Sequence, residues 1–87
     1  MQERELKLLF NAGCFEFCRA IPISMAKGWN LKFVTADQRE EVLTLQRELK
    51  EREFKSLDGA VSVARRIGFD WVRVEIGNLQ WEERLSA

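Results

Sequence analysis

The clearest periodic segment of the chain spans residues 57–67, where apolar side chains recur at helical spacing. Ser56 precedes it in the position of an N-cap, and Asp58 in the first turn suits the positive end of a helix dipole. Gly68 suits a left-handed C-terminal position, after which Phe69 packs back on the last turn. The pattern predicts an amphipathic helix whose apolar stripe consists of Leu57, Ala60, Val61, Ala64 and Ile67.

A shorter amphipathic helix is predicted over residues 3–12, and two strands follow it. Residues 14–21 form the first strand, which ends at Pro22 because proline has no N–H group to donate to a sheet. Residues 29–35 alternate between apolar and polar side chains and form the second strand. A turn over residues 24–28 joins the two strands into an antiparallel hairpin. The core face of the second strand consists of Trp29, Leu31 and Phe33.

The first strand carries apolar side chains on both of its faces. Strict alternation separates them into Phe15, Phe17 and Ile21 on one face and Cys14, Cys18 and Ala20 on the other. In so small a chain, this excess of apolar side chains predicts a sheet that is buried on both sides, either by helices or by a second copy of the chain.

Residues 36–55 permit two interpretations. Their composition favours a helix, with Val42, Leu45 and Leu49 on its apolar face. The same two leucines also fit the alternating pattern of a strand, and the segment then returns as the second arm of a hairpin. We favour the hairpin, because Ser56 begins a separate helix directly afterwards.

A last strand is predicted over residues 70–76, and residues 79–87 form either a docked turn or a loose tail. In the strand, the inward side chains are Val72, Val74 and Ile76, and the outward ones are Trp71, Arg73 and Glu75. Together the elements predict one small α+β domain over residues 1–87, with a mostly antiparallel sheet of four to five strands packed by one or two helices, in the order α-β-β-(β-β)-α-β.

Composition narrows the class of protein further. The 87 residues are 46% hydrophobic, which is too apolar for a disordered chain, and no apolar stretch reaches the roughly 20 residues of a membrane span. The first residues lack the basic start and apolar core of a secretory signal, so we expect a cytoplasmic protein. Lys plus Arg and Asp plus Glu each total 14, and each third of the chain lies within two charges of neutral, so a broad basic field is missing.

Catalytic, cofactor and metal sites are not predicted. The chain has no His, which removes the commonest general base and the commonest metal ligand. Cys14 and Cys18 lie about 13 Å apart on a strand, too far for a disulfide, and are interpreted as reduced thiols that are buried or half-buried. Ser24 and Lys27 match an S-x-x-K pattern, but beside Pro22 they are interpreted as part of a turn.

Candidate partner-binding residues are arginines and tryptophans. Arg65 and Arg66 at the end of the predicted helix, Arg73 on the next strand and Arg19 on a neighbouring strand form a small basic patch if the strands pair. The helix dipole also favours arginine at this helix end without any partner. Trp71 beside Arg73 has the composition of an interface hot spot, unless the N-terminal helix or a tail residue such as Trp81 or Leu85 covers it.

Two stretches carry a family resemblance. In the first, Glu5–Gly13 leads into an apolar strand, Pro22 and then Gly28–Phe33; in the second, Arg52–Val61 runs on to Arg65–Phe69. This arrangement resembles small uncharacterised proteins encoded on bacterial plasmids and integrative elements, labelled as partition- or replication-associated accessory proteins. The resemblance implies a mobile-element setting and supports the hairpin interpretation, and it brings no catalytic residue to transfer.

The prediction for function is a non-enzymatic binding or regulatory module that acts through protein–protein contacts, with a partner protein or as a homodimer. The alternative is a nucleic-acid-binding partition or replication accessory protein that uses the local arginine patch. A salt-dependent gel shift separates the two, because phosphate contacts weaken steeply with added salt.

Overall fold

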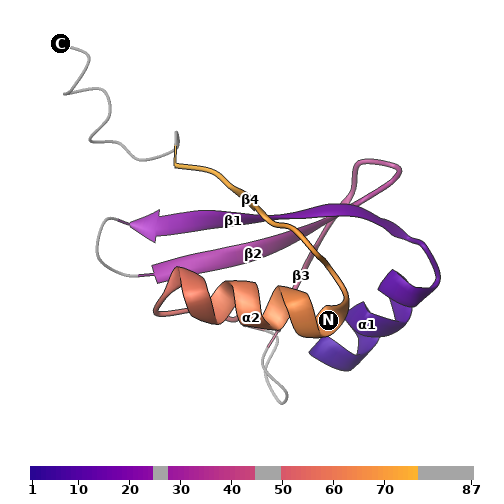
Figure 1. Ribbon diagram of the computed structural model, residues 1–87, viewed down its shortest axis with the longest axis horizontal. Helices are drawn as coiled ribbons and strands as arrows, with labels where there is room; N and C mark the ends of the chain where they lie inside the picture. The colour runs from indigo at the N-terminus through magenta and orange to yellow at the C-terminus, as the bar shows by residue number, and fades with distance from the viewer. Residues whose placement is uncertain (25–27, 45–49, 77–87) are drawn as a thin grey trace, which may run out of the picture.

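The computed structural model describes residues 1–24, 28–44 and 50–76, which form an α+β fold. Its elements are α1 (Glu3–Asn11), β1 (Phe15–Ser24), β2 (Gly28–Thr35), β3 (Glu40–Val42), α2 (Leu57–Ile67) and β4 (Arg73–Val74) (Figure 1). The sheet order is β3-β2-β1-β4, with β2 antiparallel to both β1 and β3, and β4 parallel to β1. In the part of the chain that is described, no helix is long and apolar enough to cross a membrane.

The core lies between one face of the sheet and helix α2, which contacts both β1 and β2 (Figure 1). Helix α1 packs beside the C-terminal end of α2 and contributes Leu6, which is fully buried. Aromatic rings join α1 to the sheet, since Phe69 after α2 contacts Phe10 of α1 at 4.7 Å and Phe33 of β2 at 5.8 Å between ring centroids. The structure confirms the helix predicted over residues 3–12 and the predicted antiparallel hairpin of β1 and β2.

Helix α2 has the predicted ends, but its buried face differs by one position. The Ser56 hydroxyl accepts a hydrogen bond from the Gly59 N–H at 3.1 Å, as an N-cap does. Val63 is buried instead of Val61, which is 39% exposed. The buried set Ala60, Val63, Ala64 and Ile67 follows the spacing of one helical face. Val61 is about 100° around the helix from Ala60, which turns it away from the sheet.

A bulge in β1 moves Phe15 to a different face from the one predicted, whereas Phe17 lies opposite the buried Cys18 and Ala20 as predicted. The pairing with β2 shifts register between Phe15 and Phe17, so that an extra residue is inserted at Glu16. Phe15 therefore packs towards the core, where its ring lies 5.9 Å from that of Phe33. Phe17 lies on the opposite face, because Cys18 after it is fully buried in the core.

Strand β1 also continues beyond Pro22, contrary to the prediction that it ends there. Pro22 lies opposite Trp29 in the pairing of β1 with β2. The backbone N–H and carbonyl of Trp29 both form hydrogen bonds of 2.8 Å with Phe54, on the side of β2 that faces away from β1. In an antiparallel pair, alternate positions exchange no hydrogen bonds, and a proline at such a position loses nothing. Trp29 itself is partly buried against the core, as predicted.

Residues 36–38 form a turn, and the described residues after it contain strand β3 and no helix, in agreement with the hairpin interpretation. β3 pairs with β2, and beyond it Thr44 forms an isolated antiparallel bridge with Glu51. The Arg52 N–H also donates to the Leu43 carbonyl at 2.7 Å. Of the alternative helical face, Val42 lies in β3 and not in a helix, and Leu45 and Leu49 lie outside the described residues.

The last strand is much shorter than predicted. Only Arg73 and Val74 form β4, rather than residues 70–76. Val74 is 41% exposed and Ile76 is 55% exposed, so neither is an inward core residue as predicted. Both side chains are exposed because β4 is the edge strand of the sheet, and α2 packs on β1 and β2 instead. Val72 alone of the predicted inward set packs partly against the core.

Candidate functional site

The structure places the predicted partner-binding residues in three locations. Arg19 on β1 and Arg73 on β4 are register partners, which confirms that these two strands are neighbours. Arg65 and Arg66 lie in the last turn of α2. Trp71 precedes β4 at the sheet edge, and the predicted candidate Trp81 lies outside the described residues.

Trp71 is exposed and is held by contacts on the sheet face opposite α2. Its ring stacks on Phe17, with centroids 5.9 Å apart and planes within 10°. The Arg73 guanidinium also lies over the Phe17 ring, 4.6 Å from its centroid. The Trp71 carbonyl accepts a weak hydrogen bond from the Cys18 Sγ at 3.9 Å. These contacts hold the ring in place while 55% of the residue remains accessible, and they confirm the predicted outward face.

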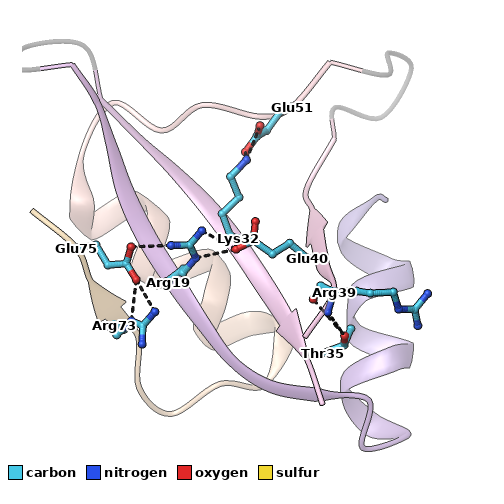
Figure 2. A network of polar contacts seen from close by, with 8 residues as sticks. All are labelled: Arg19, Lys32, Thr35, Arg39, Glu40, Glu51, Arg73 and Glu75. Carbon is cyan, nitrogen blue, oxygen red and sulfur yellow. Dashed lines mark hydrogen bonds and ion pairs between the residues drawn. The ribbon is translucent and has the colours of Figure 1, made fainter. Parts of the chain in front are cut away.

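Arg19 and Arg73 are engaged by carboxylates, as Figure 2 shows. Arg19 joins β3 to the segment after β4: its Nη1 lies 2.6 Å from Glu75 Oε1, and its Nε donates to Glu40 Oε2 at 2.9 Å. Arg73 Nη2 lies 2.6 Å from the other Glu75 oxygen. Burial raises the pKa of Glu75, but the hydrogen bond from Arg73 and the charge of Arg19 outweigh it, so the net pKa is lowered. The acidic partners largely neutralise this half of the predicted basic patch.

Arg66 points away from this network towards α1. Its Nε and Nη2 donate to the two carboxylate oxygens of Glu3 at 3.0 and 2.9 Å. The hydrogen bond from Arg66 lowers the pKa of Glu3. This bidentate pair joins the two helices, so Arg66 has a structural partner and does not extend the patch around Arg73. Of the four arginines, the structure brings Arg19 and Arg73 together and places Arg66 against α1.

Arg65 lies at a pocket of about 580 Å³ between α2 and the segment that leads into β4. Val61 and Arg65 of α2 line one side, and Asp70, Trp71 and Val72 line the other. Arg65 and Asp70 are both exposed, and neither takes part in an ion pair within the described part of the chain. The pocket thus combines aliphatic and aromatic side chains with one charge of each sign.

We call the surface formed by Phe17, Val61, Arg65, Asp70, Trp71 and Arg73 the Trp71 surface. Sequence reasoning predicted Trp71, Arg73 and Arg65 but missed Phe17, Val61 and Asp70. Phe17 was assigned to the same face as Phe15, but the bulge turns Phe15 into the core, and Phe17 alone lies beneath Trp71. Asp70 had one available signal, because it is a charged residue directly before an outward tryptophan.

The two thiols are half-buried and buried, as predicted. Cys14 is half-buried, Cys18 is fully buried, and both are free cysteines. Burial raises the pKa of the Cys18 thiol to about 12, so this group stays protonated at neutral pH and is a poor nucleophile. Of the S-x-x-K pattern, the backbone of Ser24 belongs to β1, and Lys27 lies outside the described residues.

The Trp71 surface offers contact groups rather than reactive ones. It presents a flat aromatic ring, an aliphatic side chain and charged groups at the edge of a sheet. Among the described residues, no three Cys, Asp or Glu side chains gather closely enough to hold a metal ion. Comparisons with protein-family models, with curated proteins and with solved structures found no match for this chain, so its function is inferred from this geometry.

Proposed function

We propose that this chain is a small non-enzymatic binding module whose Trp71 surface contacts another protein. The observation that carries the proposal is the exposed Trp71 ring, stacked on Phe17 and 55% accessible. Tryptophan and arginine are the residue types most enriched at interface hot spots, and a side chain already held in place loses little conformational entropy on binding. Trp71 and Arg73 meet both conditions on one surface.

A protein partner is favoured over nucleic acid by the state of the arginines. Arg19 and Arg73 share Glu75, and Arg66 is bound to Glu3. A phosphate would have to compete with these carboxylates, and each phosphate contact would leave an acidic side chain nearby. Arg65 is the one member of the predicted patch that takes part in no ion pair in the described part of the chain.

The biological setting forms part of the same proposal. The stretches Arg52–Val61 and Arg65–Phe69 resemble accessory proteins of bacterial plasmids and integrative elements. We therefore place the protein in the bacterial cytoplasm in a regulatory accessory role. In this role a contact module requires no catalytic group of its own.

Site-specific photo-crosslinking tests the proposal. A benzophenone amino acid is introduced at position 71 and, in a matched control, at Leu8, which is exposed on α1. The proposal expects a discrete crosslinked protein from position 71 that is absent from position 8. The captured protein is then purified, and its affinity is measured for the Trp71→Ala and Leu8→Ala variants. Trp71→Ala should weaken binding at least about tenfold, while Leu8→Ala should leave it unchanged.

Two results would overturn the proposal. One is an equal affinity of the wild type and Trp71→Ala for every partner captured at position 71. The other is a gel shift with duplex DNA that weakens steeply with added salt and is lost in Arg65→Gln, which would establish the nucleic-acid alternative.

A further inference from the structure

The aromatic half of the Trp71 surface consists of Phe17, Trp71 and Arg73, which lie on the sheet face away from α2. We call residues 70–76, which contain β4, the edge segment. We propose that Glu75 is the positioning residue of this half: its carboxylate holds the edge segment against β1, and the aromatic half forms only while the segment is docked. The inference rests on the proposed function, because it concerns how the contact surface is formed.

The backbone pairing that holds the edge segment is small. Strand β4 has two residues and pairs in parallel with β1 at the edge of the sheet. The Glu75 N–H adds a hydrogen bond to the Ala20 carbonyl at 2.9 Å. Strands of globular proteins usually have about 3–10 residues, so a pairing this short depends on other contacts.

Burial of apolar side chains contributes little to the docking of this segment. Val74 and Ile76 are exposed, and Val72 packs only partly against the core. The Trp71 ring covers Phe17 on the sheet face away from α2 and lies outside the core. Polar side-chain contacts therefore have a large share in keeping the edge segment on the sheet.

Glu75 makes such contacts with both of its carboxylate oxygens, as Figure 2 shows. Its Oε1 accepts a hydrogen bond from Arg19 Nη1 of β1 at 2.6 Å, and its Oε2 lies 2.6 Å from Arg73 Nη2. Arg19 also donates to Glu40 of β3, so this anchor is itself fixed to the sheet. The side chains of Glu75 and Arg19 are 18% and 22% exposed, so solvent screens their attraction less than that of a fully exposed pair.

Docking of the edge segment assembles the aromatic half from two strands. Phe17 belongs to β1, whereas Trp71 and Arg73 belong to the edge segment. The Trp71 ring and the Arg73 guanidinium both lie against the Phe17 ring, and Glu75 holds that guanidinium in place. A partner of the aromatic half therefore binds the docked form alone, and its apparent affinity is reduced by the fraction of molecules that are released.

Cys18 provides a reporter of release that needs no partner. The thiol is fully buried, and its Sγ donates to the Trp71 carbonyl at 3.9 Å, so departure of the edge segment uncovers it. In a Cys14→Ala background, the rate of native thiol labelling follows the population of the released form. Glu75→Ala should label at least about fivefold faster than the parent, because a hydrogen-bonded carboxylate is lost.

Glu51→Ala is the matched control for this measurement. Glu51 also pairs with a cation at 2.9 Å, and that cation, Lys32 of β2, shares a sheet face with its register partner Arg19. Strand β2 is separated from β4 by β1, so loss of this pair should leave the edge segment docked. Cys18 in Glu51→Ala should therefore be labelled at the rate of the parent.

Fluorine NMR separates positioning by Glu75 from a general loss of stability. The chain is labelled with 5-fluorotryptophan, and the variants Trp71→Phe and Trp29→Phe assign the two resonances. In Glu75→Ala the Trp71 resonance should move towards its position in the denatured chain, while that of Trp29, which packs partly against the core, stays native. Glu75→Gln keeps an uncharged acceptor and should give a smaller shift in the same direction.

Three outcomes would overturn the inference. The first is equal labelling of Cys18 in Glu75→Ala and in the parent. The second is a Trp71 resonance that stays at its native position in both Glu75 variants. The third is a shift of the Trp71 and Trp29 resonances together in both variants, which would show that Glu75 supports the whole fold. These measurements use the chain without a partner, so the crosslinking result at position 71 judges the protein-binding function separately.

Discussion

Gly28 is a residue of the β1–β2 hairpin whose replacement should destabilise the fold strongly. It begins β2 with a φ of +125°, which side chains other than glycine rarely adopt, and a Cβ built there lies 2.2 Å from the Phe54 carbonyl oxygen. That oxygen belongs to the backbone and already accepts a hydrogen bond from Trp29, so it cannot rotate aside. Gly28→Ala should lower the free energy of unfolding by about 2–4 kcal/mol, measured by urea denaturation.

Gly13 provides the matched control for this prediction. Its φ is also positive, at +79°, but a Cβ built there meets nothing within 4 Å. Gly13→Ala should therefore cost only the backbone penalty of about 1 kcal/mol. Equal destabilisation by the two variants would show that the close approach of Phe54 to Gly28 is not the source of the effect.

The two cysteines should differ sharply in reactivity. Cys18 is fully buried, and burial raises the pKa of its thiol to about 12, whereas Cys14 is half-buried just before β1. A thiol reagent applied to the native protein at pH 8 should modify Cys14 and leave Cys18 intact, since the thiolate is the reacting species. Peptide mass spectrometry identifies the modified site. Denaturant should make both sites reactive, and rapid native modification of Cys18 would contradict the structure.

At the scale of elements, the N-terminus of α2 depends on a single hydroxyl. The Ser56 Oγ accepts the hydrogen bond from the Gly59 N–H, which no helix carbonyl can accept. Ser56→Ala should lower the free energy of unfolding by about 1 kcal/mol. Ser56→Asp keeps an acceptor at the helix N-terminus and should be close to wild type in the same urea titration. A loss of stability in Ser56→Asp equal to that of Ser56→Ala would contradict this account of the cap.

The elements that could be predicted from sequence are those specified by local chemistry. The ends of α2 follow from Ser56 and Gly68, which act within one turn of the chain. The β1–β2 pairing follows from alternation in two adjacent segments. The bulge at Glu16 could not be predicted in this way, because it depends on which residues of β2 lie opposite it. The exposure of Val74 likewise depends on where α2 packs across the sheet.

The same distinction between local and long-range interactions applies to the residues of the candidate site. An outward Trp71 follows from alternation and is confirmed. The pairing of Arg19 with Glu40 and Glu75 joins residues 21 and 56 positions apart in the chain, so no local pattern indicates it. Sequence reasoning therefore located the arginines but could not show that acidic side chains from β3 and from beyond β4 already bind them.

At the scale of the whole molecule, the balanced charge reflects specific pairing between elements. The bridges of Arg19 join β1 to β3 and to the segment after β4, Lys32 of β2 pairs with Glu51 at 2.9 Å, and Arg66 joins α2 to α1. Such partly exposed pairs contribute little stability individually. Their collective effect is to tie neighbouring elements together, while other charged residues of the described chain, Arg65 and Asp70 among them, take part in no ion pair.

This charge arrangement predicts a flat dependence of stability on pH between about 5 and 8, because the chain contains no His and the usual carboxyl and thiol pKa values lie outside that range. Below pH 4.5, the unfolded chain takes up protons that the native carboxylates resist. The pKa values are lowered by the hydrogen bond from Arg66 at Glu3, by that from Thr35 at Asp37, and by the arginines at Glu75 despite its burial. Stability should therefore fall as the pH falls through these lowered values.

The alkaline side has the opposite sign and a different cause. Above pH 9.0 the unfolded Cys18 thiol ionises, while the native thiol keeps its proton up to a pKa of about 12, so stability should fall as the pH rises through this interval. Urea titrations at one protein concentration across about pH 3–11 measure both slopes. Glu75→Gln should reduce the acid slope alone, and Cys18→Ala should reduce the alkaline slope alone. A marked change in the free energy of unfolding between about pH 5.5 and 7.5 would contradict this prediction, because it would require a group whose pKa is strongly displaced into that range.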